Sequence, residues 1–161
     1  MKQVFVAAGS NIEAPHNLQR ALAELERRFG PLTVSSAYRN AAFGFEGPDF
    51  INLAVGFRTD RSLREVVAGL HEIEALCGRP CDAPKWTSRP IDLDILLYGD
   101  LVHEEAGLKL PRPCLLKQAY MLGPMAEIAG ELRHPVAGKT LRELWLGFDS
   151  SAHPLTRVQL T

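Results

Sequence analysis

The order of apolar patterns along the chain restricts its fold more than any other feature. Apolar residues recur every three or four positions from about 15 to 29 and from 62 to 76, which predicts two amphipathic helices. Strand-like apolar patterns occupy residues 2–8, 32–38, 50–59 and 91–98. A strand–helix–strand–strand–helix–strand order is that of the split βαβ, or ferredoxin-like, arrangement. We therefore predict an α+β fold in which helices pack on an antiparallel sheet.

Composition limits the class of protein. The 161 residues are 46% apolar and 23% charged, which is typical of one globular domain spanning 1–161 and excludes disorder as the main state. The net charge of -1 argues against nucleic acid and against a polybasic membrane contact. No apolar run approaches the roughly 18 residues that span a bilayer. Three cysteines, an odd number, favour a reducing, cytoplasmic setting, and we expect a monomer.

Local signals predict where several elements begin and end. Pro15 suits a first helical turn and Gly30 a helix end, while Ser62 with Glu65 fits a capping box. After a short extended piece leading to residue 111, residues 115–128 have a helical pattern. We expect a kink or break there at Gly123-Pro124. A last helical turn is expected over 140–146, and residues 147–161 are expected to form a flexible tail.

The string IDLDI at residues 91–95 is the sharpest chemical motif. In a strand, Asp92 and Asp94 point to the same face, roughly 6.6 Å apart. Two neighbouring carboxylates repel each other unless a cation or water lies between them, and Mg²⁺ accepts one or two carboxylates together with substrate phosphates. A solvated strand face is the alternative. We expect Leu96 and Tyr98 to continue the same face and to be partly buried, which favours a metal site.

A basic and aromatic loop precedes this strand. Residues 79–90 contain Arg79, Lys85, Trp86 and Arg89. Cations next to a Mg²⁺ site are what polyphosphate transfer requires, and an indole ring stacks well on a purine. The alternatives are a solvated loop for the charges and a core anchor for Trp86. Proximity to the acid pair favours the functional interpretation.

Asn52 lies on the strand face opposite the apolar stripe of residues 51, 53, 55 and 57. Its amide offers donors and an acceptor in one plane, which matches the edge of a pterin or purine. A hydrogen bond to neighbouring backbone is the alternative. The sequence contains no Walker-type phosphate loop, no G-x-G-x-x-G motif, no complete zinc ligand set and no G-x-S-x-G motif.

From about Val4 to Ile128, the chain resembles the 6-hydroxymethyl-7,8-dihydropterin pyrophosphokinase family of folate biosynthesis. The matching pieces are Gly9-Ser10-Asn11, Gly44 with Pro48-Asp49-Phe50-Ile51-Asn52, Ile73-Glu74 with Gly78-Arg79, and Trp86-x-x-Arg89-x-Ile91-Asp92-Leu93-Asp94-Ile95. The last string is the most specific of them.

The resemblance implies a compact ferredoxin-like domain that transfers the pyrophosphoryl group of ATP to the pterin hydroxymethyl oxygen and releases AMP. It implies two Mg²⁺ ions held by Asp92 and Asp94, with Arg89 as the third catalytic residue. The positions implied near ATP are Glu74, Arg79, Lys85, Trp86, Arg89, Ile95, Arg112 and Lys117. The positions implied for the pterin are Asn40, Phe43, Gly44, Phe50, Asn52 and Tyr120, with Phe50 and Tyr120 on either side of the ring.

The chain departs from the family pattern at several basic positions. Cys81 stands where a basic residue is common, and Gln118 where an arginine is expected. Arg112 replaces a histidine, and Asn40-Ala41 replaces Thr-Pro. We hypothesise that Arg112, together with Lys117 and Lys85, supplies part of the missing positive charge.

Two other functions share some of these features. A two-metal nucleotidyl transferase or cyclase on a ferredoxin-like palm also carries paired acids on a strand. A non-catalytic pterin- or nucleotide-binding paralogue would explain the altered cations. Release of AMP in the presence of ATP, Mg²⁺ and the pterin distinguishes the pyrophosphokinase from both.

Overall fold

The computed structural model describes residues 1–41, 47–78, 90–105, 107–152 and 154–160. In chain order the elements are β1 (Lys2–Ser10), α1 (Ala14–Phe29), β2 (Thr33–Val34), β3 (Ala37–Asn40), β4 (Phe50–Thr59), α2 (Leu63–Leu76), β5 (Asp92–Tyr98), β6 (His103–Glu105), β7 (Leu108–Leu110), the 3₁₀ turn η1 (Pro113–Leu116), α3 (Ala119–Ala129), α4 (Leu141–Leu146), the 3₁₀ turn η2 (Ser150–Ala152) and β8 (Thr156–Val158).

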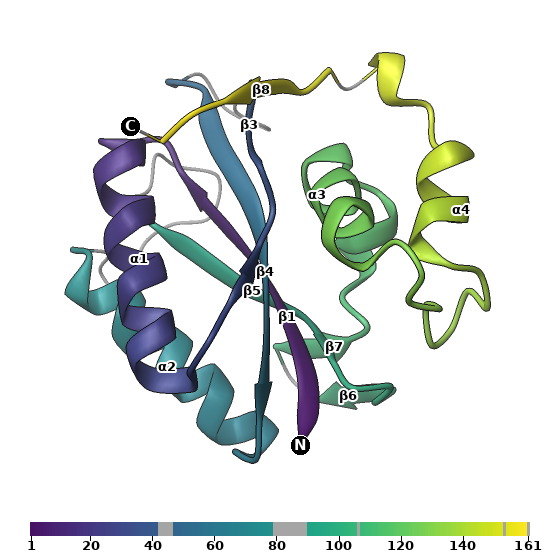
Figure 1. The fold of residues 1–161 in the computed structure, drawn as a ribbon, viewed down its shortest axis with the longest axis horizontal. Coiled ribbons are helices and arrows are strands. Elements are labelled where there is room, and N and C mark those ends of the chain that lie inside the picture. The colour runs from purple at the N-terminus through teal and green to yellow at the C-terminus, as the bar shows by residue number, and fades with distance from the viewer. Residues whose placement is uncertain (42–46, 79–89, 106, 153, 161) are drawn as a thin grey trace.

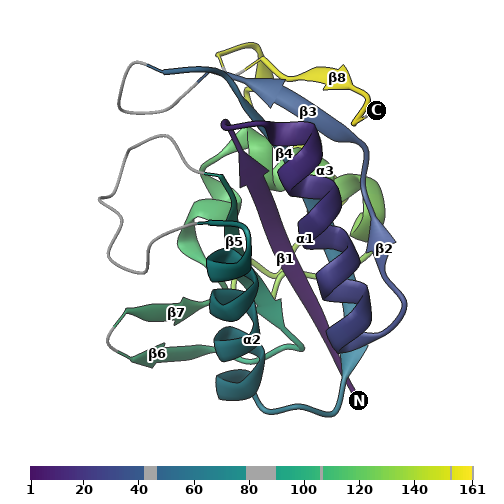
Figure 2. The same ribbon diagram turned by 90° about the vertical axis from the view of Figure 1, so that its left-hand side faces the viewer.

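An antiparallel sheet forms the centre of the molecule. Its strand order is β5-β1-β4-β3-β8, with β2 also paired to β4. Helices α1 and α2 cover one face, and α3 lies on the other with α4 outside it (Figures 1 and 2). The first four strand positions and the two covering helices are those of the ferredoxin-like arrangement, so the predicted fold class is confirmed.

The alternation of side chains along β4 divides them between two apolar cores, as predicted. Ile51, Leu53 and Val55 pack with α1 and α2 in one core, whereas Ala54 packs with α3 in the other. Each core buries a continuous apolar surface, which is the main favourable contribution to folding. Asn52 projects on the α3 face, and this face carries the polar residues discussed below.

The predicted helix boundaries are confirmed where capping residues exist. Pro15 lies in the first turn of α1, and the backbone N–H of Gly30 donates to the Glu26 carbonyl at its end. At the start of α2, the Ser62 hydroxyl accepts from the Glu65 N–H and the Glu65 carboxylate accepts from the Ser62 N–H. These bonds satisfy donors that a helix start leaves unpaired.

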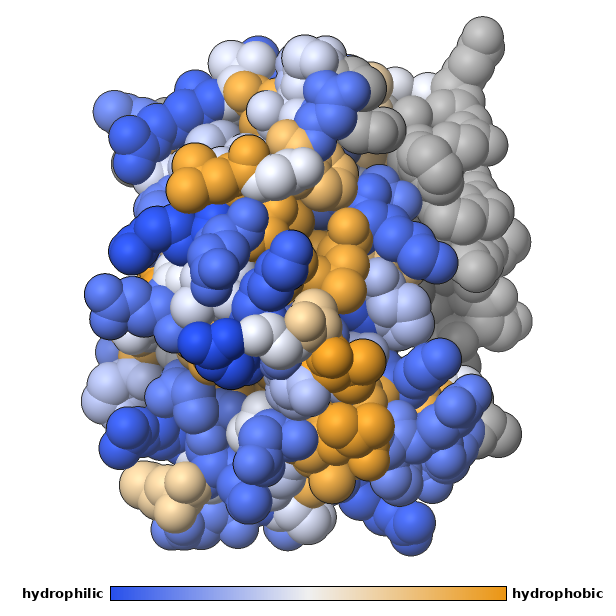
Figure 3. Space-filling model, turned by 90° about the vertical axis from the view of Figure 1, so that its right-hand side faces the viewer, coloured by the Kyte–Doolittle hydropathy of each residue, from blue (hydrophilic) through white to orange (hydrophobic). Residues whose placement is uncertain are grey.

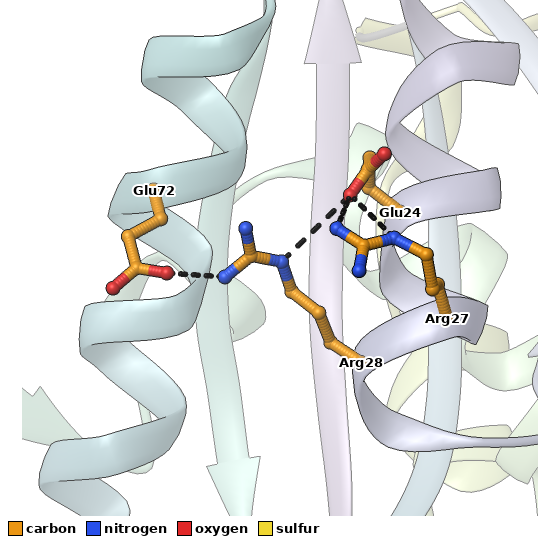
Figure 4. A network of polar contacts seen from close by, with 4 residues as sticks. All are labelled: Glu24, Arg27, Arg28 and Glu72. Atoms are coloured by element: carbon orange, nitrogen blue, oxygen red, sulfur yellow. Dashed lines mark hydrogen bonds and ion pairs between the residues drawn. The ribbon is translucent and has the colours of Figure 1, made fainter.

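Charged residues connect α1 and α2 on their outer surface. Arg28 of α1 lies between Glu24 of the same helix and Glu72 of α2, and Glu24 also accepts from Arg27 at 2.6 Å (Figure 4). The charged groups are at least partly exposed, and water and salt screen such surface pairs, so they contribute little to stability. Burial of the two apolar helix faces therefore determines the helix packing.

The single strand expected over 32–38 is instead two strands, β2 and β3. Val34 lies opposite Val55, but Tyr38 lies opposite Asn52, so β3 contains one extra residue relative to β4. At the interruption, the Ser35 hydroxyl accepts from the Ala54 N–H at 2.8 Å. A side chain thus replaces a backbone carbonyl in the ladder, which is a bulge that residue pattern alone does not reveal.

A second bulge changes the predicted face of Tyr98. Phe5 lies opposite Leu97, whereas Val6 lies opposite Ile95, so Leu96 is an extra residue in β5. Leu96 keeps the face of the acid pair, but Tyr98 turns to the α1/α2 side. The expectation that Tyr98 shares a face with the two acids is therefore wrong.

The region after β5 also differs in detail from the prediction. The extended piece leading to Pro111 is the β6/β7 hairpin, and the helical pattern from residue 115 is broken at Lys117-Gln118 rather than at Gly123-Pro124. Helix α3 continues through Pro124. Proline removes one backbone donor there, while neighbouring apolar side chains keep the helix packed on the sheet.

The C-terminal residues, expected to be a flexible tail, contain η2 and β8 instead. Strand β8 pairs with β3, with Val158 opposite Ala37. Arg157 donates to the Ser36 hydroxyl, and Glu127 of α3 accepts from the Ser36 N–H at 2.7 Å. Strand β8 is held at the sheet edge by backbone pairing and by polar side chains, so it needs few apolar residues. Its sequence therefore has no clear strand pattern that would have predicted it.

The outer surface near α4 is mixed in character. Apolar groups there are interrupted by polar ones (Figure 3), and Val136 and Leu146 are among the exposed apolar side chains of the molecule. None of the described helices is both long enough and apolar enough to cross a membrane.

Candidate active site

The acid pair lies on β5, on the sheet face that α3 covers. Asp92 and Asp94 are partly exposed, whereas Ile91, Leu93 and Ile95 are buried in the α1/α2 core. The prediction that the two carboxylates share a face is thus confirmed. Side chains that alternate across a strand make this placement independent of the rest of the fold.

Small residues of β1 lie between the acid pair and Asn52. Gly9 is opposite Asn52 on one side and Asp92 on the other, and Ala7 is likewise flanked by Ala54 and Asp94. A Cβ atom on Gly9 would overlap the Asn52 Oδ1. Glycine therefore allows the Asn52 amide to lie across β1 toward the acids, a role that sequence analysis did not assign to it.

Replacement of Gly9 by alanine should displace the Asn52 side chain. We expect a loss of about 1–3 kcal/mol in the free energy of unfolding, measured by urea denaturation. The loss should be much smaller when Gly9→Ala is introduced into an Asn52→Ala protein, because the overlap is then absent. Equal losses in both backgrounds would show that the Asn52 amide does not require glycine at this position.

Asn52 and Asn40, predicted to act together, are adjacent in the structure. Asn52 is 7% exposed, and its Nδ2 donates to the Asn40 Oδ1. Within the described part of the chain its amide bonds to this side chain and not to backbone, so the alternative interpretation is not supported. Phe50 lies opposite Asn40 and is half-buried on the face of Asn52. The three residues form a polar and aromatic strip at the end of β4.

Tyr120, near the start of α3, approaches the acid pair from above the sheet. The pKa of its hydroxyl is raised to about 12, mainly by burial and in smaller part by the charges of Cys114, Asp94 and Asp92. The hydroxyl is therefore protonated at neutral pH and acts as a donor. The charges of both acids therefore act on the Tyr120 hydroxyl.

Arg112 is fixed to the edge of β5 beside Asp94. Its Nε donates to the Ile95 carbonyl at 2.8 Å, and one terminal nitrogen lies 4.0 Å from the Asp94 Oδ1. Its backbone N–H also donates to the Leu96 carbonyl at 3.0 Å. Lys117 is exposed in the connection between η1 and α3, three residues before Tyr120. Of the two proposed replacement cations that the structure describes, Arg112 is the one with an ion pair to the acid pair.

Glu74 holds the strand that carries the acids. It is 8% exposed on α2, and its carboxylate accepts from the Leu93 N–H at 2.8 Å. Among the described strands β5 is at the edge of the sheet, and the Glu74 carboxylate supplies an acceptor for this N–H. The resemblance places both Glu74 and Ile95 near ATP, and the Ile95 side chain is buried in the α1/α2 core. The sequence did not indicate that Glu74 binds the backbone of β5.

Several predicted residues cannot be placed. Those that lie outside the described residues are Phe43, Gly44, Arg79, Lys85, Trp86 and Arg89. Over the described ranges, no group of three or more His, Cys, Asp or Glu side chains could hold a metal ion. Two neighbouring carboxylates on an open face suit Mg²⁺, which completes its coordination with water and substrate phosphates. The donor set therefore fits a metal that arrives with a nucleotide.

Comparison with known proteins agrees with this arrangement. The model of the 7,8-dihydro-6-hydroxymethylpterin-pyrophosphokinase (HPPK) family matches residues 5–130. A 2-amino-4-hydroxy-6-hydroxymethyldihydropteridine pyrophosphokinase from Synechocystis sp. is 39% identical over 150 residues, which cover 91% of this chain and 76% of the relative. The Aquifex aeolicus protein of the same name is 32% identical over 145 residues, covering 89% and 90%.

Solved structures share the fold. The chain superimposes on the Plasmodium falciparum HPPK-DHPS structure with pteroate with a TM-score of 0.76 at 14% identity, over 92% of this chain. It spans 42% of that longer chain, less than half its length. This likeness shows the fold alone, whereas the family model and the closer relatives show descent. The chain therefore belongs to the 7,8-dihydro-6-hydroxymethylpterin-pyrophosphokinase family.

Proposed function

We propose that this chain transfers the pyrophosphoryl group of ATP to the hydroxymethyl oxygen of 6-hydroxymethyl-7,8-dihydropterin and releases AMP. One observation carries the proposal: Asp92 and Asp94 share a sheet face with Asn52, and Gly9 and Ala7 lie between them. A phosphate-binding group and a heterocycle-reading group thus lie on one surface. Such positioning is the main requirement of phosphoryl-type transfer.

In the reaction, the hydroxymethyl oxygen forms a bond to the β-phosphorus of ATP. The bond from that phosphorus to the oxygen bridging the α-phosphate breaks, AMP leaves, and the hydroxyl proton is released. Asp92 and Asp94 would hold two Mg²⁺ ions. When bound, these ions neutralise phosphate charge and favour deprotonation of the hydroxyl. Arg112, with its Nε fixed on Ile95, presents its terminal N–H groups toward the same region.

The pterin would lie with its polar edge toward Asn52 and Asn40. Phe50 and Tyr120 would pack on its two faces, since both lie on the sheet face that bears Asn52. The protonated Tyr120 hydroxyl is a further donor near the acids. The proposal assigns Phe43 and Gly44 to the pterin, and Arg79, Lys85, Trp86, Arg89 and Lys117 to ATP, on the basis of the family resemblance.

The decisive experiment measures AMP formed from ATP, Mg²⁺ and the hydroxymethyldihydropterin. AMP that appears only with the pterin and disappears with excess EDTA supports pyrophosphoryl transfer. Free pyrophosphate without a pterin product would indicate nucleotidyl transfer instead. Binding of both substrates without AMP would favour the non-catalytic paralogue, which the replacement of basic residues at Cys81 and Gln118 keeps as the second candidate.

The cellular setting is also part of the proposal. Cys77 and Cys114, the two cysteines that the structure describes, are free thiols. Free thiols support the reducing, cytoplasmic setting expected from the sequence. We further propose that the chain acts as a monomer and as a single domain.

A further inference from the structure

A cavity is lined in part by Arg112. Its volume is about 420 Å³, and it lies between the β6/β7 hairpin, η1 and the 134–136 segment. The polar side chains that line it are His103, Glu104, Lys109, Arg112 and His134. Neither the acid pair nor any predicted pterin residue belongs to this lining. The cavity thus adjoins the proposed active site at Arg112, which lines the cavity and also has one terminal nitrogen 4.0 Å from the Asp94 Oδ1.

His134 gives this cavity a hydrogen-bond donor on a largely buried ring. The residue is 4% exposed, and its Nδ1 accepts from the backbone N–H groups of Val136, at 3.1 Å, and Ala137, at 3.0 Å. Burial lowers the pKa of the imidazole, so the ring is neutral at neutral pH and carries its proton on Nε2. No described residue accepts from Nε2, and this atom is not among the described side-chain nitrogens that are fully buried without a partner. Nε2 therefore keeps access to solvent, and an acceptor on a ligand in the cavity can bind it.

The charges around the cavity favour an anion. Lys109 and Arg112 carry two positive charges, against one negative charge on Glu104, which lies opposite Lys109 in the hairpin. The Nε of Arg112 is held by the Ile95 carbonyl, so its terminal nitrogens are oriented before a ligand arrives. Phosphate oxygens accept strongly from guanidinium and ammonium groups, and also from an imidazole N–H.

The remaining lining residues of the cavity are apolar and favour a ligand that has an apolar part. Apolar side chains, Val102, Leu116 and Val136 among them, line the cavity together with three neighbouring apolar residues of the 110–113 segment. A bare inorganic ion would leave this surface in contact with water. A small phosphate monoester with a flat or apolar body satisfies both the donors and the wall.

We propose that this cavity is a binding site for a small phosphate monoester. His134 Nε2, Lys109 and the terminal nitrogens of Arg112 bind the phosphate, and the apolar wall contacts the ester group. The proposal does not depend on the pyrophosphokinase activity, because it concerns residues outside the acid pair and is tested without ATP or Mg²⁺.

Phenyl phosphate is a suitable probe, and the imidazole ¹H–¹⁵N signals of His134 report binding at this site alone. We expect a saturable shift of the Nε2 signal with a dissociation constant of about 1 mM. Phenol, which lacks the anion, and inorganic phosphate, which lacks the ring, should each bind at least fivefold more weakly. A His134 signal that does not move would overturn the proposal, and inorganic phosphate binding as tightly as the ester would overturn the role of the apolar wall.

Matched variants test the charge contribution. Lys109→Gln should weaken phenyl phosphate binding about five- to tenfold. Lys139→Gln removes the same charge from the loop that follows His134 but does not line the cavity, and it should change affinity less than twofold. Equal effects of the two substitutions would mean that the net charge of the protein, and not this cavity, attracts the anion.

Discussion

Replacing Asp94 by asparagine should reduce AMP formation by about a thousandfold. The substitution keeps the size of the side chain but removes one of two negative charges that would hold Mg²⁺ against the phosphates. Stabilisation of transferring phosphate by a metal contributes several kcal/mol, and each 1.4 kcal/mol corresponds to about tenfold in rate. The rate should be measured as AMP released at saturating ATP, pterin and Mg²⁺.

The fold should tolerate this change. Asp94 is partly exposed, and without Mg²⁺ the substitution relieves repulsion from Asp92 but also loses the ion pair with Arg112. We therefore expect only a small change in the free energy of unfolding in Mg²⁺-free buffer. Asp100→Asn, in the exposed turn after β5, is the matched control and should keep near-normal activity. An Asp94→Asn enzyme with a near-normal rate would refute the metal assignment.

The second large effect is expected for Arg112→Ala. If Arg112 replaces cations that are missing elsewhere, its loss should lower turnover about a thousandfold, the scale of an arginine acting on a transferring phosphoryl group. Arg112→Lys should recover part of that loss, because lysine keeps the charge but lacks the planar fork that donates to Ile95 and faces Asp94. Steady-state AMP release measures both variants.

Arg64→Ala provides the control for Arg112. Arg64 is exposed on α2 and has the same charge, so its removal should leave turnover within about twofold. Unchanged turnover in Arg112→Ala would mean that the altered positions are not compensated by this residue. In that case Lys85 and Lys117 would be the next candidates.

Local pattern was sufficient for the parts of the site that depend on neighbours in the chain. The shared face of Asp92 and Asp94 follows from the two-residue period of a strand, and the Ser62 cap follows from the pairing with Glu65 three residues later. Both features involve residues that are two or three positions apart in the chain. They are therefore set locally as long as no bulge falls within the segment.

The pairing register between neighbouring strands could not be predicted from local sequence pattern. The extra residue at Leu96 reverses the face of Tyr98, and the extra residue in β3 relative to β4 divides the strand predicted over 32–38. A one-residue slip moves a side chain to the opposite face, and nothing within a single strand specifies where its partner bulges. The prediction of a flexible tail over residues 147–161 was wrong for a related reason. Strand β8 forms because it pairs with β3, which is distant in the chain.

The sequence by itself determined the order of elements, the caps and the two acids on one face, because these depend on separations of a few residues. Tertiary structure alone decided that Gly9 makes room for Asn52, that Glu74 holds the Leu93 N–H and that Arg112 reaches Asp94. These contacts join segments that are distant in the chain, so they are set by strand register and helix packing. Local propensity contains no information about them, because they form only when the whole sheet is assembled.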